Sequence, residues 1–210
     1  MVENPYLAAV EQSCPRRLLF TTSQFDYTHS AQKFDLQGKF AYAIPNQEAI
    51  NTLVGLSPLV EIGAGTGYWA SLLTQAGADI ICYDEQPGFN HWCKHDPYHA
   101  IAVGGPEQIA LHADRTLFLC WPPMSPMASQ ALQQYQGRHV AYIGEPEGGC
   151  TANDEFFMLL GQAWQERCHV DLPQWYGLHD CLWVYERSAE VRSELITEKA
   201  TVIPFPQKGE

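Results

Sequence analysis

The sequence predicts an α/β protein with a doubly wound, mostly parallel β-sheet covered by helices on both faces. Short apolar runs alternate with amphipathic segments over most of the chain. The apolar run at 116–121 is stopped by two prolines, as is typical of a strand buried on both faces. Three alternating glycines follow the run at 59–62 and precede an amphipathic segment, which indicates a tight turn from strand to helix.

The elements follow in order along the chain. Pro45 and Pro106 each lie at the start of an expected helix, since proline is favoured in a first helical turn. The expected order is helix 45–53, strand 59–62, a helix after the glycines, strand 79–84, strand 101–103, helix 106–111, strand 116–121, helix 127–135, strand 139–144, helix 153–168 and strand 181–187. Ligands of such sheets bind beyond the carboxyl ends of the strands. The loops after 62, 83, 103, 120 and 143 are therefore expected to converge on the site.

Length and charge narrow the class of protein. The chain has 210 residues, of which 46% are hydrophobic, and this suffices for the core of one domain. With 24 acidic against 12 basic residues the net charge is -12, and the basic residues do not cluster. Because nucleic acid binding depends on a basic face, DNA or large RNA is not the expected partner. Small molecules and protein side chains remain open, and a small molecule is the expected substrate.

The seven cysteines are dispersed and form no Cys-x-x-Cys pair. They are expected to be reduced core thiols of a cytoplasmic protein. The chain starts without a basic segment followed by an apolar one, and it has no apolar stretch of about 18 residues, so no membrane segment is expected.

The glycine turn carries the strongest functional signal. It has the form Glu61-x-Gly63-x-Gly65-x-Gly67, and Asp84 ends the next apolar run about 20 residues on, as expected when strand, helix and strand occupy that interval. A dinucleotide site requires glycine where this chain has Tyr68, which disfavours a dehydrogenase.

This pattern resembles the first motif of the class I S-adenosylmethionine-dependent methyltransferases, in which an acidic residue at the position of Asp84 holds the ribose hydroxyls. Taken together with the segments 119–123 and 148–151, this pattern is also similar to the sequences of a group of uncharacterised methyltransferase-like proteins. The resemblance implies a seven-stranded sheet with an antiparallel last strand, S-adenosylmethionine as cofactor, and three regions: an N-terminal extension or lid over 1–55, the cofactor-binding domain over 56–188 and a C-terminal arm over 189–210. The implied cofactor residues are Glu61, Gly63, Ala64, Gly65, Gly67, Tyr68, Asp84, Glu85, Gly104, Cys120 and Trp121.

The loop after 116–121 is the first candidate for the reacting site. Amino-group methyltransferases carry Asp, Asn or Ser before Pro-Pro and an aromatic residue, whereas this chain has Trp121 and Met124 at those positions. The departure argues against adenine N6 methylation. The Pro122 carbonyl can still orient an amine, with Pro123 contacting the substrate, and Trp121 either packs or offers a cation–π surface.

Two further segments add candidates. Glu145 directly follows the expected strand 139–144 and is a candidate general base, with a solvated loop residue as the alternative. Asp154 is a candidate substrate ligand or a residue that stabilises a helix start. In the N-terminal extension, Tyr42 and Tyr27 are candidates for a lid over the substrate.

Three histidines, His91, His95 and His99, are spaced four apart, but Pro97 disfavours the helix that would align them. We therefore expect a surface loop and no metal site, with His91 or His99 as alternative bases. The leading hypothesis is an S-adenosylmethionine-dependent methyltransferase that acts on a small molecule, with an amine as the candidate acceptor. The alternatives are a non-catalytic protein that binds S-adenosylmethionine and a nucleic-acid amino methyltransferase.

Overall fold

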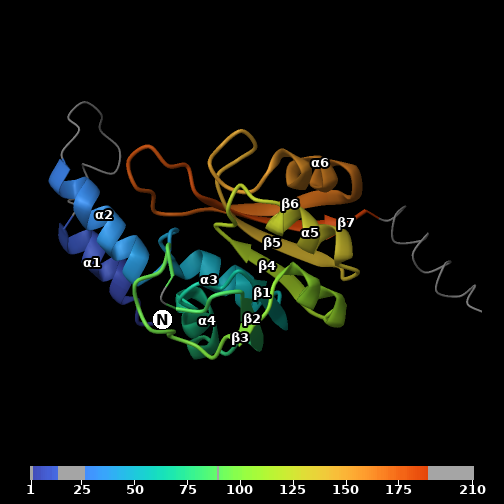
Figure 1. Ribbon diagram of the computed structural model, residues 1–210, viewed down its shortest axis with the longest axis horizontal. Coiled ribbons are helices and arrows are strands. Elements are labelled where there is room, and N and C mark those ends of the chain that lie inside the picture. Colours follow the sequence, from blue (N-terminus) through green and yellow to red (C-terminus); the bar gives the residue numbers. More distant parts are fainter. Residues whose placement is uncertain (1, 14–26, 89, 189–210) are drawn as a thin grey trace, which may run out of the picture.

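The computed structural model describes residues 2–13, 27–88 and 90–188 (Figure 1). One seven-stranded sheet has the order β3-β2-β1-β4-β5-β7-β6. The strands are β1 (Leu59–Ile62), β2 (Ile80–Asp84), β3 (Ala102–Val103), β4 (Thr116–Cys120), β5 (His139–Gly144), β6 (Trp164–Asp171) and β7 (Cys181–Arg187). The pairs among β1 to β5 are parallel, whereas β7 runs antiparallel to both β5 and β6. The predicted fold class, including its antiparallel last strand, is confirmed.

Helices cover both faces of the sheet. They are α1 (Pro5–Ser13), α2 (Tyr27–Lys39), α3 (Gln47–Val54), α4 (Tyr68–Gln75), the 3₁₀ helix η1 (Pro106–Leu111), α5 (Met127–Gln134) and α6 (Asp154–Ala163). Successive strand residues point to opposite faces, so Phe118 packs with α1, α3 and α4 while Leu117 and Leu119 pack with η1, α5 and α6. Two apolar cores therefore hold the sheet between two helical layers.

One expected element was wrong. The helix predicted over 153–168 ends at Ala163, and its last residues belong to β6. The polar residues that follow Trp164 lie exposed along the sheet edge, where pairing with β7 satisfies the backbone groups that face this strand. Trp164 itself is buried because it stacks on Tyr135, with ring centroids 5.7 Å apart, and receives the Arg187 guanidinium 4.2 Å above its ring. Strand pairing and these contacts outweigh the helical pattern.

In the N-terminal extension, α1 packs against α4 and the segment between β6 and β7, and Figure 1 shows α1 and α2 beyond one end of the sheet. Tyr6 of α1 stacks on Phe40, with centroids 5.1 Å apart, and its backbone N–H donates to the Tyr68 hydroxyl at 3.1 Å. The Trp175 indole donates to the Tyr6 hydroxyl at 3.0 Å, and Thr66 donates to the Phe40 carbonyl. The division into an extension over 1–55 and a domain over 56–188 stays a prediction, and the expected arm over 189–210 lies outside the described residues.

The cysteine prediction holds only in part. All six described cysteines are free, and Cys82 and Cys181 are buried as expected. Cys150 and Cys168 are exposed, because one lies in a loop and the other on the edge strand β6. Within the described ranges, no helix combines the length and apolarity that would let it cross a membrane.

Candidate active site

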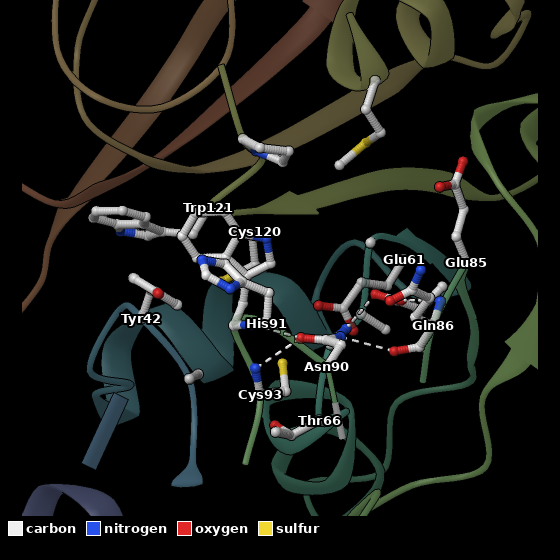
Figure 2. Close-up of a pocket in the computed structure, with 18 of the residues that line it drawn as sticks. Tyr42, Glu61, Thr66, Glu85, Gln86, Asn90, His91, Cys93, Cys120 and Trp121 are labelled. Atoms are coloured by element: carbon white, nitrogen blue, oxygen red, sulfur yellow. Dashed lines mark hydrogen bonds between the residues drawn. The ribbon is translucent and has the colours of Figure 1, made fainter. Parts of the chain in front are cut away.

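A cavity of about 790 Å³ lies at the carboxyl ends of β1, β2 and β4 (Figure 2). Small-molecule pockets measure about 300–1,000 Å³, so this one has room for a ligand of nucleoside size and a second small molecule. This is the position expected from the strand order. Ligands of such sheets bind where the strand order reverses, and here β1 lies between β2 on one side and β4 on the other. The predicted site residues that line it are Tyr42, Glu61, Gly63, Ala64, Gly65, Tyr68, Asp84, Glu85, Cys120, Trp121 and Pro123.

The glycine turn forms one wall of the cavity. Gly63 and Gly65 have φ of 78° and 58°, in the left-handed region that favours glycine. A Cβ at Gly63 would lie 2.8 Å from Met127 Cε, and one at Gly65 would lie 3.0 Å from Cys93 Sγ. The backbone conformation thus favours glycine at both positions, and glycine leaves the backbone bare toward the cavity.

Asp84 joins the end of β2 to this turn. Its Oδ2 accepts a hydrogen bond from the Gly65 N–H at 2.8 Å, and its Oδ1 accepts from the Gln86 N–H at 2.7 Å. A carboxylate has about four lone-pair sites, so both oxygens can accept further hydrogen bonds from hydroxyl groups in the cavity. The spacing that the sequence predicted for Asp84 is therefore realised as a direct contact with the glycine turn.

Glu61 lies beneath the turn, where it is 2% exposed and also lines the cavity. The Cys82 thiol donates a hydrogen bond to its Oε2 at 3.7 Å. Burial raises the pKa of Glu61 to about 8, and the nearby charge of Asp84 contributes to the increase. The carboxyl group is thus mainly neutral at pH 7, and a cation bound beside it would favour the ionised form.

Trp121 and Tyr42 form an aromatic wall on another side of the cavity (Figure 2). Their ring centroids are 4.8 Å apart at an interplanar angle of 29°. The Trp121 indole N–H donates to Asp180 Oδ1 at 2.7 Å, and its backbone N–H donates to the Ile143 carbonyl at 2.7 Å. Trp121 therefore packs and lines the cavity at once, so the two interpretations left open by the sequence are compatible.

Five predicted site residues do not line the cavity: Gly67, Gly104, Pro122, Glu145 and Asp154. A Cβ on Gly67 or Gly104 would meet protein atoms at 3.1 and 2.6 Å, so these glycines serve close packing. The Pro122 carbonyl accepts from the Ala152 N–H at 2.9 Å, which does not favour its role in orienting an amine. Asp154 is exposed in the first turn of α6, as the helix-start interpretation requires.

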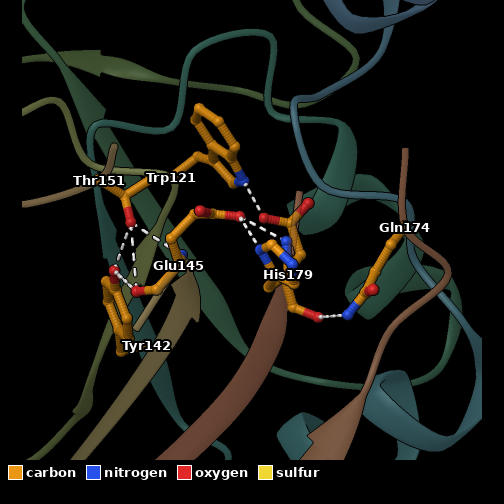
Figure 3. Close-up of polar contacts among 7 residues, drawn as sticks. Trp121, Tyr142, Glu145, Thr151, Gln174 and His179 are labelled. Carbon is orange, nitrogen blue, oxygen red and sulfur yellow. Dashed lines mark hydrogen bonds and ion pairs between the residues drawn. The ribbon is translucent and has the colours of Figure 1, made fainter. Parts of the chain in front are cut away.

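Glu145 is buried and its carboxylate points toward the loop between β6 and β7 (Figure 3). It accepts a hydrogen bond from the His179 backbone N–H, and its Oε1 lies 3.8 Å from His179 Nδ1. Its own N–H donates to Thr151 Oγ1 at 2.8 Å. This arrangement favours a role in holding the loop, and the role of general base stays a prediction.

The histidine segment forms a loop, as expected. His91 lines the cavity, whereas His95 stacks on Tyr98 with centroids 4.4 Å apart and His99 Nε2 lies 3.1 Å from Thr74 Oγ1. Among the residues that the structure describes, no group of three or more His, Cys, Asp or Glu side chains could hold a metal ion.

Asp180 is the main residue that sequence reasoning missed. It is fully buried, and burial raises its pKa to about 7, with the charge of Glu145 adding to the increase. Its hydrogen bond from Trp121 and the charge of Lys33 on α2 act in the opposite direction. Asp180 directly precedes β7 and has no motif around it, so only the fold brings it to Trp121. Trp92, which lies edge-on to Tyr42 at 6.2 Å, was missed for the same reason.

The strand order, the antiparallel β7 and the glycine turn after β1 define the Rossmann-like fold of the class I methyltransferases. No family model matches the chain, and no curated protein matches it. Among solved structures, it is similar to the magnesium protoporphyrin IX methyltransferase ChlM of Synechocystis PCC 6803 with bound SAM, at 13% identity and a TM-score of 0.47, covering 87% of this chain and 95% of that one. It is similar to a TehB-like SAM-dependent methyltransferase of Corynebacterium glutamicum, at 14% identity and a TM-score of 0.47, covering 77% and 97%. It is also similar to the N-methyltransferase NodS of Bradyrhizobium japonicum, at 13% identity and a TM-score of 0.44, covering 78% and 98%.

Proposed function

We propose that this protein is an S-adenosylmethionine-dependent methyltransferase that acts on a small molecule, with an amine as a candidate acceptor. The observation that carries the proposal is the contact of Asp84 with the glycine turn on the wall of a cavity large enough for two ligands. S-adenosylmethionine supplies an electrophilic methyl group on a sulfonium when it is bound.

The residues of the cavity fit this cofactor. Bare backbone at Gly63 and Gly65 would admit the methionine portion, and the carboxylates of Asp84 and Glu85, which line the cavity, can accept hydrogen bonds from ribose hydroxyls. Glu61 offers a buried carboxyl group that responds to a positive charge. A cationic ligand suits the three acidic side chains of this wall.

The acceptor occupies the remaining part of the cavity in this proposal. Methyl transfer requires a desolvated nucleophile in line with the methyl group, so orientation and exclusion of water contribute most of the rate. Tyr42 from the N-terminal extension and Trp121 after β4 enclose this part. His91 lines the same cavity and is a candidate to take up the proton of an amine, with Glu145 as the base proposed from sequence.

The competing proposals differ in measurable ways. A non-catalytic protein would bind S-adenosylmethionine without forming S-adenosylhomocysteine in the presence of any acceptor. A nucleic-acid methyltransferase would show binding that falls steeply with salt, which a net charge of -12 does not favour.

The first experiment is calorimetric titration with S-adenosylmethionine, S-adenosylhomocysteine and NAD. We expect binding of the first two only. Asp84→Ala should weaken it by roughly 1 to 3 kcal/mol, which is about 5- to 150-fold in Kd. Asp114→Ala is the matched control, because Asp114 is an exposed aspartate before β4 that does not line the cavity. Unchanged affinity in a folded Asp84 variant would remove the ribose role, and no binding of either nucleoside would overturn the proposed cofactor.

A further inference from the structure

The aromatic wall of the cavity is separated from its acidic wall. Glu61 and Glu85 lie on one side of the close-up, and Tyr42 and Trp121 lie on the other (Figure 2). Met124, three residues after Trp121, also lines the cavity and is 62% exposed, so it leaves apolar surface open toward a ligand.

Trp121 is held in an unfavourable backbone conformation. Its φ is 53°, in the left-handed region that is unfavourable for a non-glycine residue and persists only where the surroundings impose it. Here the surroundings are the hydrogen bond from its N–H to the Ile143 carbonyl and the stacking of Tyr42 on its ring. The ring is thereby fixed against the cavity before any ligand binds.

Asp180 holds the indole of Trp121 by accepting the hydrogen bond from its ring N–H. This carboxyl group is fully buried, and within the described part of the chain its Oδ2 has no hydrogen-bond partner. A buried carboxyl group that is only partly satisfied is destabilising by itself, and core packing alone would be served as well by an apolar residue. The adjacent His179 is bound through its N–H by Glu145, which ties the same loop to the end of β5.

We propose that the Tyr42–Trp121 wall, positioned by Asp180, is the acceptor subsite and that it takes a flat aromatic ring carrying the methylated group. This inference rests on the proposed function and names the acceptor class of the same cavity. A flat ring can stack on an aromatic side chain of this wall, with ring centroids about 4.5–7 Å apart. A saturated ring of equal size would bury similar area without this geometry.

The test compares pairs of probes that differ only in ring aromaticity. Benzylamine is compared with cyclohexylmethylamine, and benzyl alcohol with cyclohexylmethanol, by ligand-observed NMR titration with and without saturating S-adenosylhomocysteine. We expect the aromatic member of each pair to bind about two- to tenfold tighter. Trp121→Leu should abolish this ratio. Asp180→Leu should reduce it, whereas Asp180→Asn should retain it because the amide oxygen still accepts the indole hydrogen bond. Tyr176→Leu is the control, since Tyr176 is 59% exposed and does not line the cavity.

Equal binding of the aromatic and saturated probes would overturn the inference, as would a ratio that survives in folded Trp121→Leu. Thermal melting establishes that each variant is folded, and Tyr42→Leu replaces any Trp121 variant that is not. The alcohol pair separates recognition of the ring from recognition of the amine. If S-adenosylhomocysteine does not bind, the cofactor proposal fails, but the probe ratio without it still decides the subsite.

Discussion

Replacing the buried Glu61 by glutamine should change how the stability of this protein depends on pH. The unfolded carboxyl group releases its proton near pH 4.5, whereas the folded one holds it until about pH 8. Between these values the folded state binds more protons than the unfolded state, so raising the pH favours unfolding. The stabilising contribution of Glu61 is therefore complete below pH 4.5 and is lost as the pH rises toward 8.

The magnitude follows from the size of the shift. One pKa unit corresponds to about 1.4 kcal/mol, so the change from 4.5 to about 8 amounts to on the order of 5 kcal/mol in the free energy of unfolding. Glutamine has nearly the same shape, stays neutral, and can still accept the hydrogen bond from Cys82. Glu61→Gln should thus match the wild type near pH 4.5 and be several kcal/mol more stable near pH 8.

The assay is urea unfolding of both proteins at several pH values from 4.5 to 8.5, with the difference in free energy plotted against pH. Groups that titrate in both proteins, including Asp180, largely cancel in this difference. Glu147→Gln, at an exposed loop position, controls for the loss of one glutamate. A difference that does not change with pH would refute the reasoning, because it would mean that Glu61 titrates alike in the folded and unfolded chain.

Three further predictions concern the site and its supports. Binding of S-adenosylmethionine at pH 7 should release more protons than binding of S-adenosylhomocysteine, because only the former brings a sulfonium to Glu61. Calorimetry in buffers of different ionisation enthalpy measures the number of protons released. The excess for S-adenosylmethionine should vanish in Glu61→Gln. Tyr68→Phe removes the hydroxyl that donates to Asn4 Oδ1 at 2.9 Å, so it should lower the free energy of unfolding by about 1–2 kcal/mol in urea, and no change would show that this bond does not stabilise α1. Glu145→Gln keeps an oxygen for the His179 N–H and should retain cofactor affinity and most methyl transfer, whereas a large loss of turnover at unchanged affinity would restore its role as general base.

Much of the fold could be predicted because its signals are local. Apolar runs with nearby glycine or proline located the strands β1, β2, β4 and β5, and an alternating pattern located β7, since periodicity and turn chemistry act over a few residues. The prediction was wrong at β6, where Trp164 and the polar residues after it read as a continued helix. Their conformation depends on pairing with β7, which the local pattern does not contain.

The candidate site also has one part that the sequence predicts and another part that depends on long-range contacts. The glycine turn and Asp84 are encoded by the sequence itself, because a left-handed backbone requires glycine and one strand–helix–strand unit fixes the distance to the acidic residue. The contact of Tyr42 with Trp121, the anchor provided by Asp180 and the turning of Glu145 toward His179 were decided only by the tertiary structure. These residues are distant along the chain. The strand order brings Trp121 and Glu145, which follow β4 and β5, close to the residues that precede β7, and Tyr42 reaches Trp121 from the segment between α2 and α3. Local backbone chemistry thus determined one wall of the cavity, and long-range packing determined the other.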